Sequence, residues 1–172
     1  MQFPLMWMAS TPRYRFHDQT LGRKVRHGYQ ALALSETRSV FEPLIWETGA
    51  ADAGHVDQVW FRGCHGDIGG QLGSFEAARP LANIPLVWML EKLERHGLAL
   101  PEGWRERYPC DPQAPSAGNW RGWGKVFLLR APRLVGRDPS ERIHESAVGA
   151  RVSWRTMILP AVWHKPEPGE GE

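Results

Sequence analysis

The clearest pattern along the chain is the apolar run inside segment 57–63, which reads Asp-Gln-Val-Trp-Phe-Arg-Gly. A short run of Val and aromatic residues that ends at a glycine is typical of a buried strand. We therefore predict a strand over 57–63, followed by a glycine-rich loop over 66–80. The apolar residues 3–8 predict a further strand or the end of one.

Two segments carry apolar residues at helical spacing. After Thr20, a suitable N-cap, apolar side chains recur every three or four residues, which predicts an amphipathic helix over 20–34. Asn83 is a second N-cap candidate, and the apolar residues that follow it predict a helix over 83–97 that ends at a glycine. Pro85 falls in the first turn of that helix, where proline is tolerated.

The C-terminal part of the chain is less regular. Segment 101–123 is rich in Pro, Gly and Trp without a period, which predicts a long loop or lid. Residues 125–130 read as a strand. Asp138 is followed by a proline and, three residues on, by a glutamate, which predicts the start of a short helix that reaches 148 and carries His144.

Composition and charge narrow the class of protein. Hydrophobic residues make up 42% and charged residues 23% of the 172, which is ordinary for one globular α/β domain. We expect that domain over 1–164 and a disordered acidic tail over 165–172. The 21 basic against 19 acidic residues leave a net charge of +2, and the basic ones are scattered, so we expect no nucleic-acid partner.

Three features that the sequence lacks bear on where in the cell the protein is located. Two cysteines make no disulfide framework, which favours a reducing compartment. The N-terminus lacks the features of a signal peptide, and no run approaches the length of a membrane-spanning helix. We therefore expect a cytoplasmic protein.

The strongest candidate chemistry follows the 57–63 strand. The turn Gly-Cys-His-Gly-Asp places His65 and Asp67 in a glycine-rich loop at the carboxyl end of a strand, where α/β proteins hold reactive side chains. His65 is a candidate general base, a role that requires its ring to face a solvent-accessible hollow. Asp67 is a candidate orienting carboxylate. The structural alternatives are a histidine hydrogen-bonded within its own turn and an Asx turn closed by the aspartate.

Other reactive groups are weaker candidates. His144 is a possible second functional imidazole, with a capping or packing role as the alternative. Cys64 stands beside His65 and Asp67, but adjacent side chains diverge and no second ligand cluster has zinc-like spacing, so we expect neither metal nor cofactor. A nucleophile elbow is also missing, since none of the eight serines stands in a Gly-x-Ser-x-Gly turn.

Several motifs resemble one known family. Residues 59–70, Val-Trp-Phe-Arg-Gly-Cys-His-Gly-Asp-Ile-Gly-Gly, and residues 81–90, Leu-Ala-Asn-Ile-Pro-Leu-Val-Trp-Met-Leu, are similar to segments of the uncharacterised α/β-hydrolase domain family that includes the type VI secretion phospholipase effectors. Upstream, residues 31–38 and 41–46 resemble that family's Ala-Leu-Ala-x-Asp-Glu-x-Arg and Phe-x-Pro-x-x-Trp signature. Downstream, Ile-His-Glu-Ser-Ala-Val at 143–148 resembles its Ile-His-x-Ser-Val segment.

The resemblance implies the C-terminal part of an α/β-hydrolase sheet with flanking helices. It also implies a serine esterase or phospholipase whose triad histidine falls on His65, with phospholipid or another acyl ester as substrate, a membrane surface as partner and export by a secretion system. The sequence departs from the family at Gln30, Ser35, Gly66 and Asn83, where the family has His, Asp, Ser and Asp. The family's nucleophile and acid turns have no counterpart in these 172 residues.

Three hypotheses follow. The first is a C-terminal portion of a serine hydrolase, inactive alone, whose missing half a separate chain could supply. The second is a non-catalytic lipid- or protein-binding remnant of the same fold. The third is a different hydrolase in which Asp67 and His65 act on water.

Overall fold

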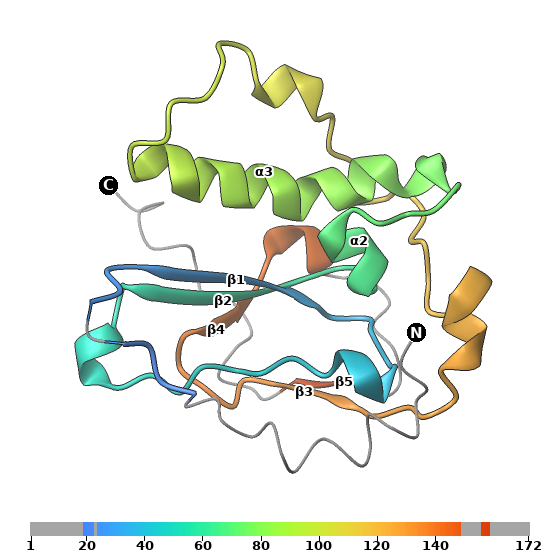
Figure 1. The fold of residues 1–172 in the computed structure, drawn as a ribbon, viewed down its shortest axis with the longest axis horizontal. Coiled ribbons are helices and arrows are strands. Elements are labelled where there is room, and N and C mark those ends of the chain that lie inside the picture. The colour runs from blue at the N-terminus through green and yellow to red at the C-terminus, as the bar shows by residue number, and fades with distance from the viewer. Residues whose placement is uncertain (1–18, 23, 149–155, 159–172) are drawn as a thin grey trace.

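The structure, a computed structural model, describes residues 19–22, 24–148 and 156–158, and Figure 1 shows their arrangement. A small parallel sheet forms the middle layer, with a long helix on one face and a two-stranded ribbon on the other. This is the mixed α/β class that the sequence predicts. The predicted strand over 3–8 and the predicted disordered tail over 165–172 lie outside the described residues.

The sheet has the strand order β1-β2-β4, and both pairs are parallel. Its strands are β1 (Gly28–Ala33), β2 (Val56–Phe61) and β4 (Glu141–Ile143). The strand predicted over 57–63 is confirmed as β2, shifted by one or two residues. Trp60 and Phe61 are both almost fully buried, on opposite faces, because helix and ribbon cover the central strand on both sides.

The helix predicted over 20–34 is wrong, because residues 28–33 form β1. Residues 28–33 pair in register with 56–61, and their side chains alternate between the two faces of the sheet. Tyr29 packs toward the helix layer, whereas Leu32 packs into the opposite core. The helical spacing of apolar residues was therefore a coincidence, overridden by strand pairing with β2.

The helix predicted over 83–97 is confirmed as α3 (Arg79–Arg95), which begins four residues earlier. Pro80, near the N-terminus, rather than Asn83 marks its start. Asn83 is buried inside the helix, and its side-chain amide donates to the Pro109 carbonyl at 2.9 Å. The helix ends where the sequence predicts, before Gly97, whose φ is 92°.

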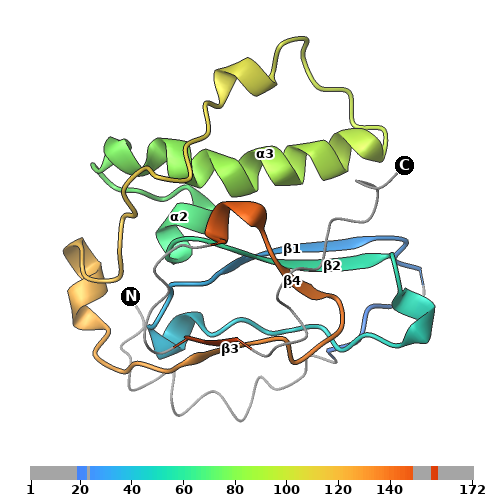
Figure 2. The same cartoon turned by 180° about the vertical axis from the view of Figure 1, so that it is seen from behind.

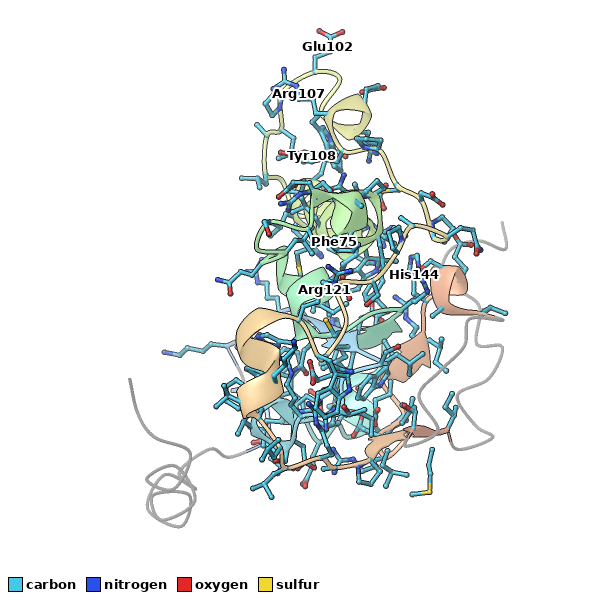
Figure 3. All side chains as sticks on the ribbon, turned by 90° about the vertical axis from the view of Figure 1, so that its right-hand side faces the viewer. Phe75, Glu102, Arg107, Tyr108, Arg121 and His144 are labelled. Atoms are coloured by element: carbon cyan, nitrogen blue, oxygen red, sulfur yellow. The ribbon has the colours of Figure 1, made fainter. Side chains whose placement is uncertain are left out.

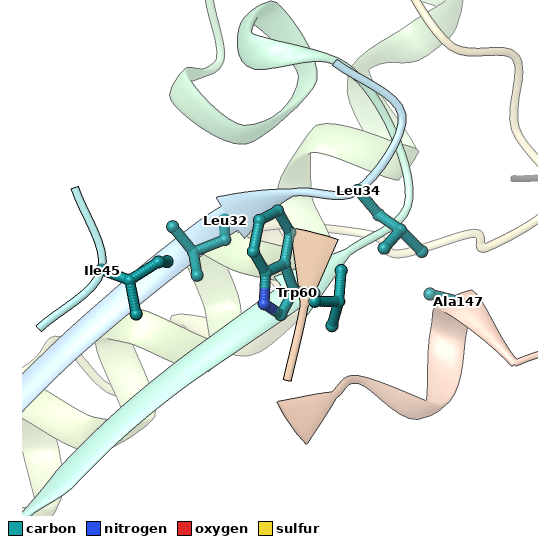
Figure 4. Packing of buried hydrophobic residues seen from close by; sticks show 6 residues of the cluster. Leu32, Leu34, Ile45, Trp60 and Ala147 are labelled. Atoms are coloured by element: carbon teal, nitrogen blue, oxygen red, sulfur yellow. The ribbon is translucent and has the colours of Figure 1, made fainter. Parts of the chain in front are cut away.

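The second face of the sheet is covered by irregular chain and a ribbon. The ribbon is the parallel pair β3 (Arg133–Val135) and β5 (Thr156–Ile158), and the chain between β1 and β2 contains the short helices η2 (Ser39–Phe41) and η3 (Ala50–Asp52). Figure 4 shows the core on this side, where Leu32, Leu34, Ile45 and Trp60 meet Ala147. The Trp60 indole donates to the Glu141 carboxylate at 2.8 Å, which ties β2 to β4 inside this core.

Two C-terminal predictions are wrong. Residues 125–130 form no strand: η6 (Gly122–Val126) occupies part of the segment, and only Arg130 makes an isolated bridge. The helix predicted over 138–148 is instead β4 followed by η7 (Glu145–Ala147), drawn in orange-red after β4 in Figure 2. The Glu141 carboxylate does reach back to the Asp138 amide at 2.8 Å, but the chain then joins β2 as a strand.

The predicted loop over 101–123 is confirmed apart from η5 (Arg105–Arg107) and the start of η6, but it is fastened along its length. Asp111 N donates to the Pro80 carbonyl at 3.1 Å. Arg62 donates to the Pro112 and Ala114 carbonyls, both at 2.8 Å. These bonds make the loop a fixed wall of the molecule. Within the described residues, no helix has the length and apolar character needed to cross a bilayer.

Replacing Trp60 with alanine should lower the free energy of unfolding by about 3–5 kcal/mol, because the change opens a cavity in a closed core. Urea unfolding measures this difference. Leu128→Ala is the matched control: its side chain is 75% exposed, so its effect should stay within about 0.5 kcal/mol. Equal losses in the two variants would contradict the assignment of Trp60 to the core.

Candidate functional site

The carboxyl ends of the three parallel strands meet at one edge of the sheet. The chain that leaves β1 carries Glu36, β2 leads into α2 (His65–Gly69), and His144 directly follows β4. The His65 amide donates to the Glu36 carboxylate at 3.0 Å, and His144 N donates to the Trp60 carbonyl at 2.9 Å. The sheet therefore brings two predicted site residues, and one unpredicted carboxylate, to its carboxyl edge.

His65 is the first residue of α2, and its side chain is exposed. The imidazole stacks on the Phe41 ring with centroids 4.4 Å apart and an interplanar angle of 14°. Among the described residues, the ring nitrogens make no hydrogen bond. The aromatic stack and the backbone bond to Glu36 fix where His65 stands, while its ring nitrogens remain available to a ligand.

Glu36 anchors this edge. Its carboxylate, 1% exposed, accepts hydrogen bonds from the amides of Thr37, Arg38 and His65 and two more from the Arg38 guanidinium. The shortest of them joins Arg38 Nη2 to Glu36 Oε2 at 2.6 Å. Burial alone would raise the pKa of Glu36, but the hydrogen bonds from Arg38 and the His65 amide outweigh it and lower that pKa.

Asp67 lies two residues after His65 but faces away from its ring. The carboxylate is fully buried and accepts bonds from Cys64 N at 2.8 Å, Ser116 Oγ at 2.6 Å and Ala117 N at 2.8 Å. It makes no hydrogen bond to His65. Asp67 therefore fastens the start of α2 to the 101–123 loop, and the arrangement gives no support to the hypothesis in which it activates water.

Two glycines make this close packing possible. Gly63 has a φ of 119°, and a side chain there would meet the Asp67 Cβ at 2.7 Å. A Cβ at Gly66 would stand 2.9 Å from the Gln71 carbonyl oxygen. The turn can thus carry His65 and bury Asp67 only because both positions lack a side chain.

The exposed face of His65 borders a cavity of about 750 Å³. Its walls come from the α2 turn, the 71–75 loop and segment 117–127, including Phe41, Phe75 and Arg121. Figure 3 shows Arg121 lying beside Phe75, and its guanidinium carbon is 3.6 Å from the ring centroid. Arg38, Arg121 and Lys125 line the cavity together with aromatic rings, and its lining includes no carboxylate from the described part of the chain. Such a cavity suits a ligand with an anionic group and an apolar part.

His144 caps η7. Its Nδ1 is 2.8 Å from Ser146 Oγ and accepts from Ser146 N at 3.2 Å, while its ring stacks on Phe61 at 4.5 Å. His144 is not among the residues that line the cavity beside His65. The structure thus places it at the carboxyl edge in a capping and packing arrangement.

Cys64 is buried, and burial, reinforced by the nearby Asp67 charge, raises the pKa of its thiol to about 11. A thiol in that state is a poor nucleophile and a poor metal ligand near neutral pH. Within the described part of the chain, no three His, Cys, Asp or Glu side chains gather as a metal site.

Sequence reasoning missed Glu36 as a site residue, although the motif around it was recognised. The signal was available in segment 31–38, where an apolar alternation is followed by Glu-x-Arg. Interpreting 20–34 as a helix hid that signal, because Glu36 then follows a helix rather than a strand that ends beside His65.

Comparisons with known proteins identify one family. The family model described as "T6SS, Phospholipase effector Tle1-like, catalytic domain" matches residues 2–92, which include β1, β2, the His65 turn and most of α3. The segment that carries His144 lies beyond the matched residues. A search of curated proteins and a search of solved structures each returned no match.

Glu36→Gln should lower the free energy of unfolding at pH 7 by about 3–5 kcal/mol, because it removes the charge that compensates the largely buried Arg38. The pKa of Glu36 is lower in the folded state than its ordinary value of 4.5. Its contribution is therefore full above pH 4.5 and is lost as the pH falls through the folded-state pKa. The difference between wild type and variant should shrink below pH 4.5 in urea unfolding series, whereas exposed Glu102→Gln should show little difference at any pH. A gap that stays constant from neutral to acid pH would contradict this role of Glu36.

Asp67→Asn should loosen the 101–123 loop, because an amide nitrogen would face a donor that the carboxylate now satisfies. We expect a loss of about 1–3 kcal/mol and faster amide exchange at Ala117. The matched control is Asp111→Asn, since Asp111 is exposed and its carboxylate accepts from the nearby Gln113 N at 2.8 Å. Unchanged exchange at Ala117 in the Asp67 variant would show that the carboxylate does not hold the loop.

Proposed function

The chain belongs to the Tle1-like phospholipase effector family of the type VI secretion system, and we propose that it contributes the general base, His65, of a phospholipid or acyl-ester hydrolase. The observation that carries the proposal is the placement of His65. Its ring borders a cavity lined by cations and aromatic rings, and its backbone is fixed to a buried carboxylate at the carboxyl edge of the sheet.

In this proposal His65 is the general base of an acyl transfer. A ring nitrogen accepts the proton of a serine hydroxyl as that oxygen attacks the ester carbonyl. The imidazolium then gives the proton to the leaving alcohol, and water hydrolyses the acyl-serine by the same sequence. Arg121 and Lys125, in the cavity lining, suit the phosphate of a phospholipid, and the aromatic rings suit its acyl chains.

The serine and the triad acid come, in this proposal, from a polypeptide segment outside these 172 residues. The chain would then be the C-terminal part of the hydrolase sheet and inactive alone. This is supported by the sequence, in which no serine stands in a Gly-x-Ser-x-Gly turn, and by β1, whose outer edge pairs with no strand among the described residues.

Asp67 and His144 support the site in this proposal. Asp67 is a positioning residue, because it holds the His65 turn against the 101–123 loop through Ser116 and Ala117. His144 holds η7 under the same edge by capping it and packing on Phe61. Neither the Asp67 carboxylate nor the His144 ring transfers a proton in this proposal.

A second candidate function is that of a non-catalytic lipid-binding remnant. It is favoured by the missing nucleophile turn together with an intact cavity whose lining holds cations and aromatic rings. In this case the chain binds phospholipid but never turns it over, even when a nucleophile segment is supplied.

The test compares the chain alone with the chain joined to a segment of the same family that carries Gly-x-Ser-x-Gly. Alone, it should show no labelling by a fluorophosphonate and no hydrolysis of p-nitrophenyl butyrate. Joined, it should gain both, and His65→Ala should then lower kcat by about 10²- to 10⁴-fold.

His55→Ala is the matched control, because His55 precedes β2 at the opposite edge of the sheet and should leave kcat unchanged. Labelling of a serine within the chain alone would overturn the assignment of the nucleophile to another segment. Full activity of the joined His65→Ala variant would overturn the role of His65. A folded, joined protein without hydrolysis would favour the lipid-binding remnant.

A further inference from the structure

Segment 120–129 exposes an unusual number of large apolar side chains. Trp120 is 58% exposed, Val126 52%, Leu128 75% and Leu129 55%. We call these four side chains the 120–129 ridge. In Figure 1 the η6 part of this segment, drawn in orange, stands at the right of the molecule, apart from the α3 layer. Large apolar side chains grouped in this way on a surface mark a binding site.

The stretch of sequence that carries the ridge has charges of one sign. From 112 to 137 the sequence contains no Asp or Glu but includes five basic residues, among them Arg121 and Lys125 within the ridge segment. Both of these side chains are exposed. Exposed leucine and tryptophan interleaved with Lys and Arg is the composition of segments that lie in a membrane interface and attract anionic headgroups.

The ridge is continuous with the His65 cavity. Trp120, Arg121, Lys125 and Phe127 line that cavity, whereas Leu128 and Leu129 do not. The Phe127 ring lies 5.6 Å from Phe41, on which His65 stacks. The segment therefore borders the cavity with its aromatic and cationic side chains, while Leu128 and Leu129 lie outside it.

The size of the ridge favours a bilayer over a protein partner. A stable protein interface draws on about 20–30 residues of each partner, whereas segment 120–129 has ten. A bilayer needs only a few apolar side chains inserted among the headgroups, with cations beside them.

We propose that the 120–129 ridge docks the protein on a lipid bilayer that carries anionic headgroups and sets the His65 cavity against the membrane surface. This inference rests on the phospholipid chemistry of the proposed function and adds where the membrane is met and which headgroup charge is preferred. The ridge lies outside residues 2–92, the part matched by the family model.

The experiment is flotation of the full chain with vesicles of phosphatidylcholine alone or mixed with phosphatidylglycerol. Binding should require phosphatidylglycerol and weaken with added salt. Leu128→Ala combined with Leu129→Ala should weaken binding by about tenfold or more. Lys125→Gln should weaken it by about fivefold.

Matched controls sit at the far end of the molecule. Leu93→Ala combined with Leu98→Ala removes two exposed leucines at the end of α3, and Lys24→Gln removes an exposed lysine before β1. Both should bind vesicles as the wild type does. His65→Ala should also bind normally, which separates docking from chemistry.

Three results of the flotation experiment would overturn the inference. They are no binding to the mixed vesicles, binding that ridge and control variants share equally, and equal binding to phosphatidylcholine alone. Self-association in the absence of lipid that the Leu128 and Leu129 changes abolish would assign the ridge to a second copy of the chain instead. If the joined protein hydrolyses p-nitrophenyl butyrate but does not bind vesicles, only the docking inference fails. Vesicle binding without any hydrolysis overturns only the proposed catalysis.

Discussion

Two segments that lie far apart in the sequence meet on the buried carboxylate of Asp67. One donor, Cys64 N, belongs to its own turn, and the other two, Ser116 Oγ and Ala117 N, follow 49 and 50 residues later. A buried donor left without a partner costs free energy, so loss of the Asp67 carboxylate would destabilise all three contacts at once. The cavity beside His65 exists as a fixed space because this carboxylate holds one wall against the other.

Glu36 and Asp67 hold different segments in place at the carboxyl edge of the sheet. Glu36 holds the His65 amide and the Arg38 guanidinium, whereas Asp67 holds the loop that faces them. Both carboxylates are buried and hydrogen-bonded to donors within the protein, so neither adds negative charge to the cavity surface. The cations of the lining therefore set its electrostatic character, and among the described residues no carboxylate bonds to the His65 ring itself.

The sequence predicted the parts of the fold whose local and tertiary preferences agree. The β2 strand and the main helix were found because buried apolar runs leave few alternatives at those positions, whereas the loop predicted over 66–80 begins within helix α2. The helix predicted over 20–34 is wrong because only the helical spacing of its apolar residues was considered. Residues 28–33 form a strand because they pair with β2. The strand predicted over 125–130 is wrong because this apolar run has no partner strand among the described residues, so its side chains stay exposed. The partners of Asp67 lie too far along the chain for any local pattern to identify them.

The central position of β2 has a consequence for how the protein is made. Trp60 bonds to Glu141, 81 residues later, and β2 has β4 as its second neighbour in the sheet. While the ribosome is still adding the residues between them, one edge of β2 and its indole have no native cover. An open edge of this kind favours association with other nascent chains until β4 has emerged.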